Sequence, residues 1–291
     1  MPLKQLAEND ELGNAAAHFF KSGNVIRGDE NNALAELRPL LPSNGPKGTR
    51  VEYDIWYDMG DNKNIHGYTY TDAMAKFIYL RTASCHFSNK IMREAAQGEI
   101  TPEGEAIFQD LGSSSVDKYR LRKAKEHYDF VVFLPGTNII DKALDWDKLK
   151  NAVKQGAKLK CHPLTAPALV AKLKHTFGEG NVIDKKVSGH QLLSAASIVG
   201  CCENSEMGLV ALAQGKTTYM FGTGEGHFTY SSIYKAVWQN GKASVNNFKA
   251  ILSSKSSGLV PILSESPQEY VDGFFNYYKD MPHVSPRNTN S

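Results

Sequence analysis

Between residues 129 and 221, short apolar runs alternate with segments of helical period. The apolar runs, which we predict as strands, are 129–134, 157–161, 181–184, 197–202 and 216–221. The helical segments between them are 145–155, 167–177, 189–196 and 204–214. Strands that alternate with helices of about ten residues build a parallel sheet, because each helix returns the chain to the starting edge of the sheet. This part of the chain therefore predicts an α/β fold with a doubly wound sheet.

Composition excludes several classes of protein. The chain has 291 residues, of which 41% are hydrophobic and 22% charged, so a wholly disordered chain is excluded. The sequence contains no run of about 20 apolar residues, so no membrane-spanning helix is predicted. The first 14 residues lack the apolar stretch of a secretory signal. The net charge of +2 excludes nucleic-acid binding driven by overall charge. A local basic patch is still compatible with this net charge.

The front of the chain is less regular than the back, and we divide the two near residue 127. The expected units are residues 1–127, residues 128–266, and residues 267–291 with a helix at 267–279. In the front unit, the alternating sequence RVEYDIWY predicts a strand at 50–57. We predict helices at 71–80 and 89–97, a helix start at 101–105, and a basic helix at 117–127.

The cysteines indicate a reducing compartment. There are four, Cys85, Cys161, Cys201 and Cys202, and no two of them form a C-x-x-C pair. Three lie in the predicted strands, so we expect buried free thiols rather than disulfides or a zinc site. A cytoplasmic protein is the corresponding expectation.

Ligands of open parallel sheets bind beyond the carboxyl ends of the strands. Four predicted loops lie there: Gly136-Thr137-Asn138, His162-Pro163, 184–188 with Ser188 at its end, and 203–205. Asn204 and Ser205 precede a predicted helix whose first turn contains Gly208, an arrangement that suits a phosphate group. The alternative is that Asn204 or Ser205 simply caps the helix. His162 ends a predicted strand, where its imidazole can donate a hydrogen bond to a phosphate or sugar oxygen.

The glycines of the back unit do not match the known nucleotide-binding loops. No G-x-x-x-x-G-K-[ST] phosphate loop is present. Gly222, Gly224 and Gly226 follow a predicted strand but lack the spacing of the dinucleotide fingerprint. We interpret them as a flexible cleft loop, with Glu225 and His227 available to contact a ligand.

The stretch from 129 to 222 resembles the carboxy-terminal nucleotide-sugar domain of GT-B glycosyltransferases, most closely their capsule-polysaccharide and bacterial sialyltransferase-like branch. The resemblance covers about a third of the chain. It rests on these segments: Lys160-Cys161-His162-Pro163, 192–199, Asn204-Ser205, Gly208-Leu209, Ala211-Leu212 and Gly215-Lys216.

The resemblance implies two Rossmann-like lobes, with a reduced amino-terminal lobe on the acceptor side and a regular carboxy-terminal lobe for the donor. The final helix is expected to return to the amino-terminal lobe. The implied donor is a UDP- or CMP-linked sugar, used as substrate without a further cofactor. The resemblance implies that His162 and the Ser205 turn contact the donor phosphate. Together with the loops at the strand ends, this makes the expected donor-binding residues Gly136, Thr137, His162, Pro163, Ser188, Asn204, Ser205 and Gly208.

The same resemblance implies a catalytic carboxylate in a turn after an amino-terminal strand. The segment Asp58-Met59-Gly60 is the counterpart, so Asp58 is the candidate base, with Asp61 beside it and His66 in reserve. Asp145-Trp146-Asp147 has the D-x-D pattern of metal-binding GT-A enzymes, but it opens a helix, where acidic residues interact with the helix dipole. We therefore expect no metal.

The acceptor remains open between a surface glycan and a hydroxymethylated base in DNA, as for some phage enzymes. The predicted basic helix, with Tyr119 and Tyr128, could contact DNA phosphates, or it could be an ordinary solvated face. No stable membrane insertion is expected. The alternative functions are a non-catalytic protein that binds a nucleotide or sugar phosphate, and a sugar-nucleotide epimerase.

Overall fold

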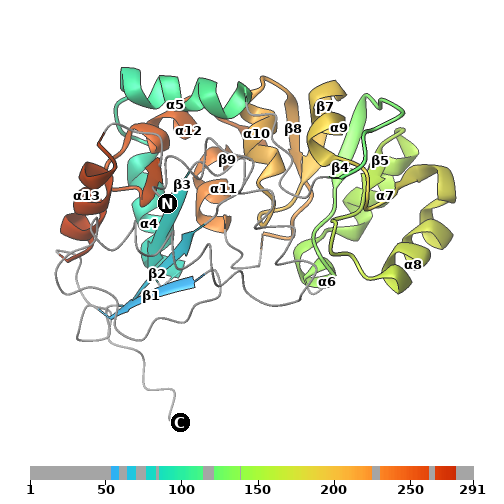
Figure 1. Ribbon diagram of the computed structural model, residues 1–291, viewed down its shortest axis with the longest axis horizontal. Coiled ribbons are helices and arrows are strands. Elements are labelled where there is room, and N and C mark those ends of the chain that lie inside the picture. The colour runs from blue at the N-terminus through green and yellow to red at the C-terminus, as the bar shows by residue number, and fades with distance from the viewer. Residues whose placement is uncertain are drawn as a thin grey trace, which may run out of the picture.

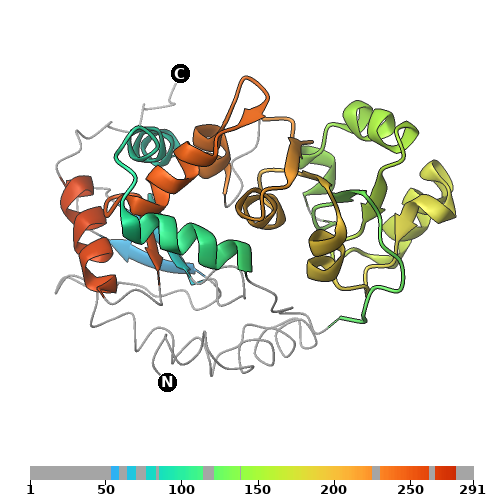
Figure 2. The same ribbon diagram turned by 90° about the horizontal axis from the view of Figure 1, so that it is seen from above.

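The computed structural model describes residues 54–58, 64–69, 77–82, 85–113, 121–137, 139–224, 230–261 and 266–279. Figure 1 shows two sheets in different halves of an elongated molecule, and Figure 2 shows the same division from above. One half contains a parallel sheet and the other an antiparallel sheet.

The parallel sheet has five strands in the order β6-β5-β4-β7-β8. Their bounds are β4 Phe130–Phe133, β5 Lys158–Lys160, β6 Val182–Ile183, β7 Ile198–Cys201 and β8 Thr217–Met220. All four pairings are parallel, as predicted. The chain starts in the centre at β4, adds β5 and β6 on one side, and then crosses to add β7 and β8 on the other. The strand order therefore reverses between β4 and β7.

Helices cover this sheet on both faces. They are α6 Ile140–Ala143, α7 Trp146–Lys154, α8 Pro167–Phe177, α9 Gly189–Ala195 and α10 Met207–Ala213, with a short 3-10 helix at Glu179–Asn181. Adjacent residues of β4 face opposite cores, since Val131 packs in the cluster with α9 and α10, whereas Val132 packs in the cluster with α7 and α8. Both valines are fully buried. Burial on both faces explains why these strands are continuous apolar runs.

The antiparallel sheet has the order β1-β2-β3-β11. Its strands are β1 Asp54–Asp58, β2 Asn64–Thr69, β3 Phe77–Thr82 and β11 Leu259–Pro261. β1 overlaps the strand predicted at 50–57. The helix predicted at 71–80 is wrong for residues 77–80, because they pair with β2 on one side and with β11, from the far end of the chain, on the other. The described front residues thus form antiparallel strands rather than the parallel strands of an expected second Rossmann-like lobe.

Among the described residues, five helices lie in the same half as the antiparallel sheet: α4 Cys85–Ala95, α5 Pro102–Ser113, α11 Ser231–Val237, α12 Val245–Ser253 and α13 Pro267–Lys279. A small hairpin, β9 Trp238–Gln239 with β10 Lys242–Ala243, separates α11 from α12. α11 and α12, which were not predicted, contact α4 and α5 (Figure 2). The rings of Phe108 and Phe248 meet edge to face at 5.9 Å. Residues 230–261 thus pack with the front unit, although the predicted boundaries group them with the back unit.

The final helix was predicted over its observed range. α13 contacts β11, and Lys255 bridges it to the front unit. The Lys255 Nζ lies 2.7 Å from Glu103 Oε2 on α5 and 3.3 Å from Glu269 Oε2 on α13. These two contacts hold α13 close to α5.

The basic helix predicted at 117–127 is wrong for the residues that the structure describes, 121–127. This segment is irregular and lies along the loop before α9, with Arg122 paired with Val187 in a parallel bridge. Arg122 N donates to Lys186 O at 2.8 Å, and Ser188 N donates to Arg122 O at 2.8 Å. These backbone pairings outweigh the helical pattern of the local sequence. Across all described ranges, no helix combines the length and apolarity needed to span a bilayer.

Candidate functional site

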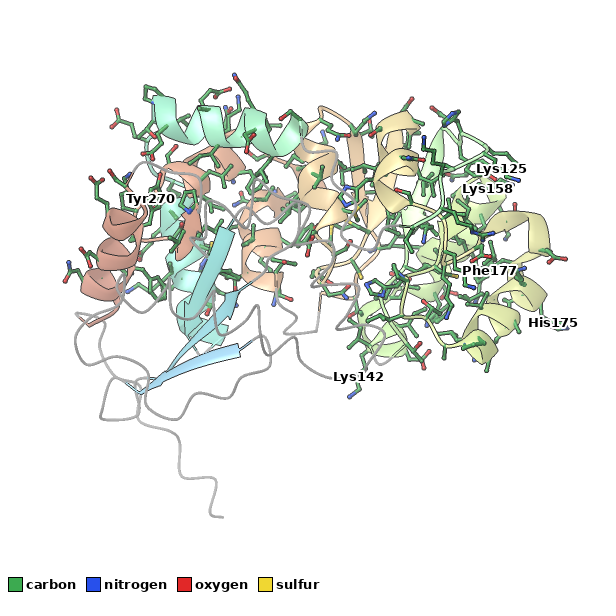
Figure 3. The ribbon with its side chains drawn as sticks, viewed as in Figure 1. Lys125, Lys142, Lys158, His175, Phe177 and Tyr270 are labelled. Carbon is green, nitrogen blue, oxygen red and sulfur yellow. The ribbon has the colours of Figure 1, made fainter. Side chains whose placement is uncertain are left out.

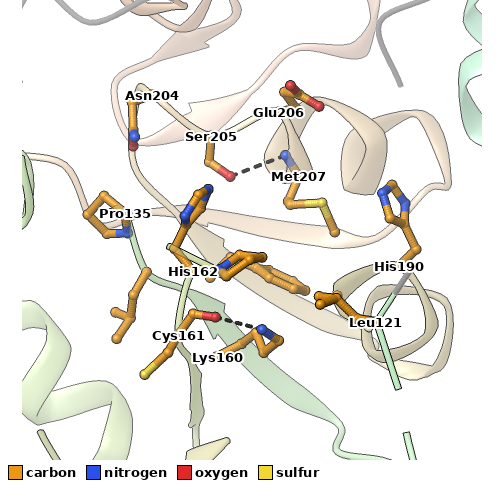
Figure 4. Close-up of a pocket in the computed structure, with 14 residues that line it drawn as sticks. Leu121, Pro135, Lys160, Cys161, His162, His190, Asn204, Ser205, Glu206 and Met207 are labelled. Atoms are coloured by element: carbon orange, nitrogen blue, oxygen red, sulfur yellow. Dashed lines mark hydrogen bonds between the residues drawn. The ribbon is translucent and has the colours of Figure 1, made fainter. Parts of the chain in front are cut away.

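A cavity of about 110 Å³ lies at the carboxyl ends of the central parallel strands (Figure 4). It is lined by residues 133–135 at the end of β4, 160–163 at the end of β5, 189–190 at the start of α9 and 204–207 after β7, together with Leu121. β4 and β7 are the two strands between which the strand order reverses. Open α/β sheets bind ligands in the crevice at this switch point, so fold and cavity indicate the same place for a ligand.

His162 is brought into the cavity by the turn after β5. Its Nδ1 accepts a hydrogen bond from Leu164 N at 3.1 Å, and its carbonyl accepts one from Thr165 N at 2.9 Å. Because Nδ1 is an acceptor, the proton of the neutral ring is on Nε2, which makes Nε2 a donor. Gly136 lies beside the ring, since a Cβ atom there would stand 3.8 Å from Nδ1.

Asn204 and Ser205 lie in the turn between β7 and α10. The Cys202 thiol donates a hydrogen bond to Asn204 Oδ1 at 2.6 Å. The carboxamide oxygen thus accepts a bond within the protein, and the NH₂ group of the same side chain is the group that can donate to a ligand. Ser205 O accepts from Tyr234 Oη at 2.6 Å, and Ser205 N donates to Cys202 O at 3.0 Å. These bonds fix the turn in place beside His162 (Figure 4).

Ser205 bonds the start of α10 without being its N-cap, which is Glu206, so the alternative in which Asn204 or Ser205 caps the helix is wrong. α10 begins at Met207, three residues later than predicted, and Ser205 Oγ accepts from Met207 N at 3.2 Å. The hydroxyl hydrogen of Ser205 is still a donor, so the bond from Met207 N and ligand binding are compatible.

Three other predicted donor-binding residues hold the frame of the site. Thr137 Oγ1 accepts from Ala166 N at 2.7 Å, at the start of α8. Ser188 is buried and caps α9, with its Oγ accepting from Gln191 N at 3.4 Å. Gly208 is buried against Cys201 and Tyr234, where a side chain has no room. Of the eight predicted donor-binding residues, the cavity lining includes His162, Pro163, Asn204 and Ser205.

The predicted catalytic residues belong to the other sheet. Asp58 is the last residue of β1 and pairs with Asn64, and His66 in β2 pairs with Trp56 and Arg81. Figure 1 shows β1 and β2 in the opposite half of the molecule from β4 and β5. Asp61, Glu225 and His227 lie outside the described residues.

Two charged residues of the cavity were not predicted. Lys160 is only 3% exposed, and its Nζ donates to Cys161 O at 2.6 Å and to Lys185 O at 3.2 Å. Glu206 is also buried, and its Oε1 accepts from Tyr230 Oη at 3.3 Å. Lys160 lies between Leu159 and Cys161 in a predicted strand, which is a sequence signal that could have identified it, whereas Glu206 follows the polar segment 203–205 and has no such signal.

The cysteines near the site are neutral thiols. Cys161, Cys201 and Cys202 are free and buried, as predicted, and Cys85 is outside the described side chains. Burial raises the pKa of Cys161 to about 11 and that of Cys201 to about 12. Nucleophilic chemistry by these thiols is not indicated, because the thiolate is the reactive form.

Asp145 and Asp147 start a helix. Asp145 Oδ1 accepts from Asp147 N at 3.1 Å and from Lys148 N at 3.0 Å, and Asp147 pairs with Lys150 at 2.9 Å. The hydrogen bond from the Lys148 backbone lowers the pKa of Asp145. Within the described ranges, no group of three or more His, Cys, Asp or Glu side chains is placed to hold a metal ion.

Comparisons with known proteins add one similarity. The sequence matches no protein-family model and no curated protein. Among solved structures, the chain is similar to KpsC of Thermosulfurimonas dismutans, a β-Kdo 2,7 transferase, with a TM-score of 0.35 and 16% sequence identity. The match covers 72% of this chain and 64% of the KpsC chain, which is less than two thirds of the latter.

Proposed function

We propose that the protein is a glycosyltransferase that binds a sugar nucleotide in the cavity between β4 and β7. The observation that carries the proposal is the position of His162, Asn204 and Ser205 around the switch-point crevice of a parallel sheet. An imidazole, a carboxamide and a hydroxyl are donors suited to phosphate oxygens. The loop after β4 lacks the glycine fingerprint of NAD-binding folds, which favours a sugar nucleotide over a dinucleotide.

In this proposal, the cavity residues act on the leaving group. When an acceptor hydroxyl attacks the anomeric carbon, the bond from that carbon to the phosphate oxygen breaks and the nucleotide gains negative charge. His162 Nε2, the Asn204 amide and the Ser205 hydroxyl donate to that charge. Donors fixed in advance stabilise developing charge without having to reorganise during the reaction. The turn around Ser205 is fixed in this sense by Tyr234 and Cys202.

The acceptor side of the proposal rests on Asp58, with Asp61 and His66 in reserve. A carboxylate that takes the acceptor proton must come within hydrogen-bond reach of the hydroxyl. A glycan hydroxyl is the acceptor we propose. An epimerase would convert the donor with no acceptor present, and a binding protein would retain the donor unchanged.

A panel of nucleotides tests donor binding. The melting temperature would be measured with UDP, CMP, GDP and NAD for wild type, His162→Ala and His175→Ala. His175 is the matched control, because it is exposed at the end of α8, on the outer side of the molecule (Figure 3). We expect UDP or CMP to raise the melting temperature of wild type by several degrees, since binding to the folded form alone stabilises it.

In the same panel, His162→Ala should weaken that nucleotide about tenfold or more, as expected for a lost hydrogen bond to a charged group, and His175→Ala should match wild type. A shift with NAD alone, or equal shifts for the two variants, would contradict the proposal. With donor and acceptor present, Asp58→Ala should lose turnover but retain the donor-induced shift.

A further inference from the structure

The cavity at the strand ends has an apolar end as well as a polar one. Leu121, Phe133 and Met207 line the same space as His162 and Asn204. Figure 4 shows Leu121 and Met207 on one side of the His162 ring and Asn204 on the other. The donors proposed for the phosphate therefore account for one end of the cavity, and the apolar end suits a different part of the ligand.

Gly189 is the residue that leaves room at this apolar end. It is the first residue of α9 and also lines the cavity. A Cβ atom on Gly189 would stand 3.4 Å from Phe133 Cε1 and 3.6 Å from Met207 Cε, which are ordinary contact distances. Gly189 is also not among the glycines with positive φ. Neither crowding nor backbone conformation thus requires a glycine here, whereas its missing side chain leaves space between the Phe133 ring and the Met207 methyl group.

We call the space bounded by Leu121, Phe133, Gly189 and Met207 the apolar slot. Its walls suit a flat aromatic ring, because phenyl rings stack or meet edge to face with other rings and the thioether of methionine contacts them favourably. His190 lines the same end of the cavity (Figure 4). An imidazole there is compatible with a nucleobase, which has polar edges and apolar faces. The base is therefore the part of a sugar nucleotide that fits the apolar slot.

The size of the cavity limits the kind of base. Its volume is about 110 Å³, whereas an engineered apolar cavity of roughly 150 Å³ binds one benzene ring. A single six-membered ring is therefore the largest flat group that the enclosed space takes. The two fused rings of a purine need more room than this.

We propose that Gly189 is a specificity-determining residue, which keeps the apolar slot open for the single ring of a pyrimidine base, while the walls of the slot leave no room for a purine. This inference rests on the proposed function and names the class of base that the donor carries.

Gly180 is a matched control for substitutions at Gly189. It is exposed in the short 3-10 helix Glu179–Asn181, where a Cβ atom meets nothing within 4 Å. The lining of the cavity does not include Gly180. Substitutions at Gly180 therefore add the same side chains to the protein without filling the apolar slot.

The test is calorimetric binding of UDP against GDP and of CMP against GMP, since the members of each pair differ in the base alone. For wild type, we expect the pyrimidine nucleotide to bind about tenfold or more tightly than its purine counterpart, the effect of one group too many in an apolar pocket. Gly189→Val should weaken the pyrimidine nucleotide about tenfold and leave the purine affinity within about twofold of wild type, so that the ratio is lost. Gly180→Val should match wild type.

Gly189→Ala keeps the test decisive should the valine variant unfold. The added methyl group makes only ordinary contacts with Phe133 and Met207, so this variant is expected to fold. It should lose part of the pyrimidine preference through weaker pyrimidine binding, whereas Gly180→Ala should retain all of it.

The outcomes separate the two proposals. Wild type that binds none of the four nucleotides contradicts the proposed function, and with it this inference. Wild type that binds GDP or GMP as tightly as the pyrimidine counterpart contradicts this inference alone, because a GDP-linked sugar is also a sugar nucleotide. A wild-type ratio that is retained in both Gly189 variants, or lost equally in the Gly180 variants, likewise contradicts this inference alone.

Discussion

The absence of a side chain at Gly208 allows the β7–α10 turn to close. A Cβ atom at this position would overlap Cys201 Sγ and Tyr234 Oη. The same Tyr234 hydroxyl donates to Ser205 O at 2.6 Å, so the close approach of Tyr234 to α10 is what holds Ser205 beside the cavity. Gly208 therefore allows the close packing of α10 against Tyr234.

Replacement of Gly208 by alanine should destabilise the protein by about 1–3 kcal/mol, the usual cost of an added group in a packed core. Gly180→Ala is the control, because a Cβ atom there meets nothing within 4 Å. The free energy of unfolding in urea would be measured for both variants. Equal values for the two would show that the contact at Gly208 relaxes without cost.

At the scale of elements, the start of α7 shows how one carboxylate organises a helix. Asp145 accepts from two backbone amides of the first turn and lies 3.5 Å from Lys148 Nζ. The Asp147 carboxylate, by contrast, is largely exposed and pairs with Lys150 Nζ at 2.9 Å. The D-x-D pattern is thus accounted for by one capping residue and one surface ion pair.

Asp145→Ala should lower the free energy of unfolding by about 1 kcal/mol at neutral pH, the typical value of a cap. The pKa of Asp145 is lowered in the folded protein, so its stabilisation is complete above the ordinary value of 3.8 and is lost as pH falls through the folded pKa. The difference between wild type and variant should therefore shrink in acid. Asp147→Ala should have an effect of a few tenths of a kcal/mol at most. A difference that persists unchanged at low pH would contradict the capping role.

The elements that could be predicted from sequence are those whose pattern is local. β4 to β8 and their helices follow from apolar runs bounded by turns, and α8 and α13 begin and end where predicted. β3 was mistaken for a helix because its strand conformation depends on pairing, and one of its two partners, β11, is far away in the sequence, with Tyr79 paired with Leu259. The helix prediction for 121–127 was wrong for a related reason, since the pairing of this segment with the loop before α9 is a tertiary contact.

The site was predictable to a similar extent. The rule for carboxyl ends of parallel strands identified His162, Pro163, Asn204 and Ser205, all of which line the cavity. Lys160 and Glu206 were overlooked because charged residues are expected on the surface, and only the fold shows that both are buried. Thr137 and Ser188 were expected to contact the ligand, whereas their hydroxyls bond backbone amides of α8 and α9.

At the scale of the whole molecule, one apolar core joins the two halves. The cluster that contains Val131 of β4 and Val210 of α10 continues through Phe108 of α5 to Phe248 of α12. α10 also packs closely on α5, where a Cβ atom at Gly112 would stand 2.6 Å from Ala213 O. The turn with Asn204 and Ser205 is therefore supported from both halves. Such support suits the proposed site, in which the hydrogen-bond donors of this turn are fixed in advance.

A crystal structure with bound UDP or CMP would test the central claim most directly. The account predicts the phosphate in the crevice between β4 and β7, with its oxygens within about 3.2 Å of His162 Nε2 and the Asn204 amide. A phosphate bound away from both residues, for example over the antiparallel sheet, would contradict it.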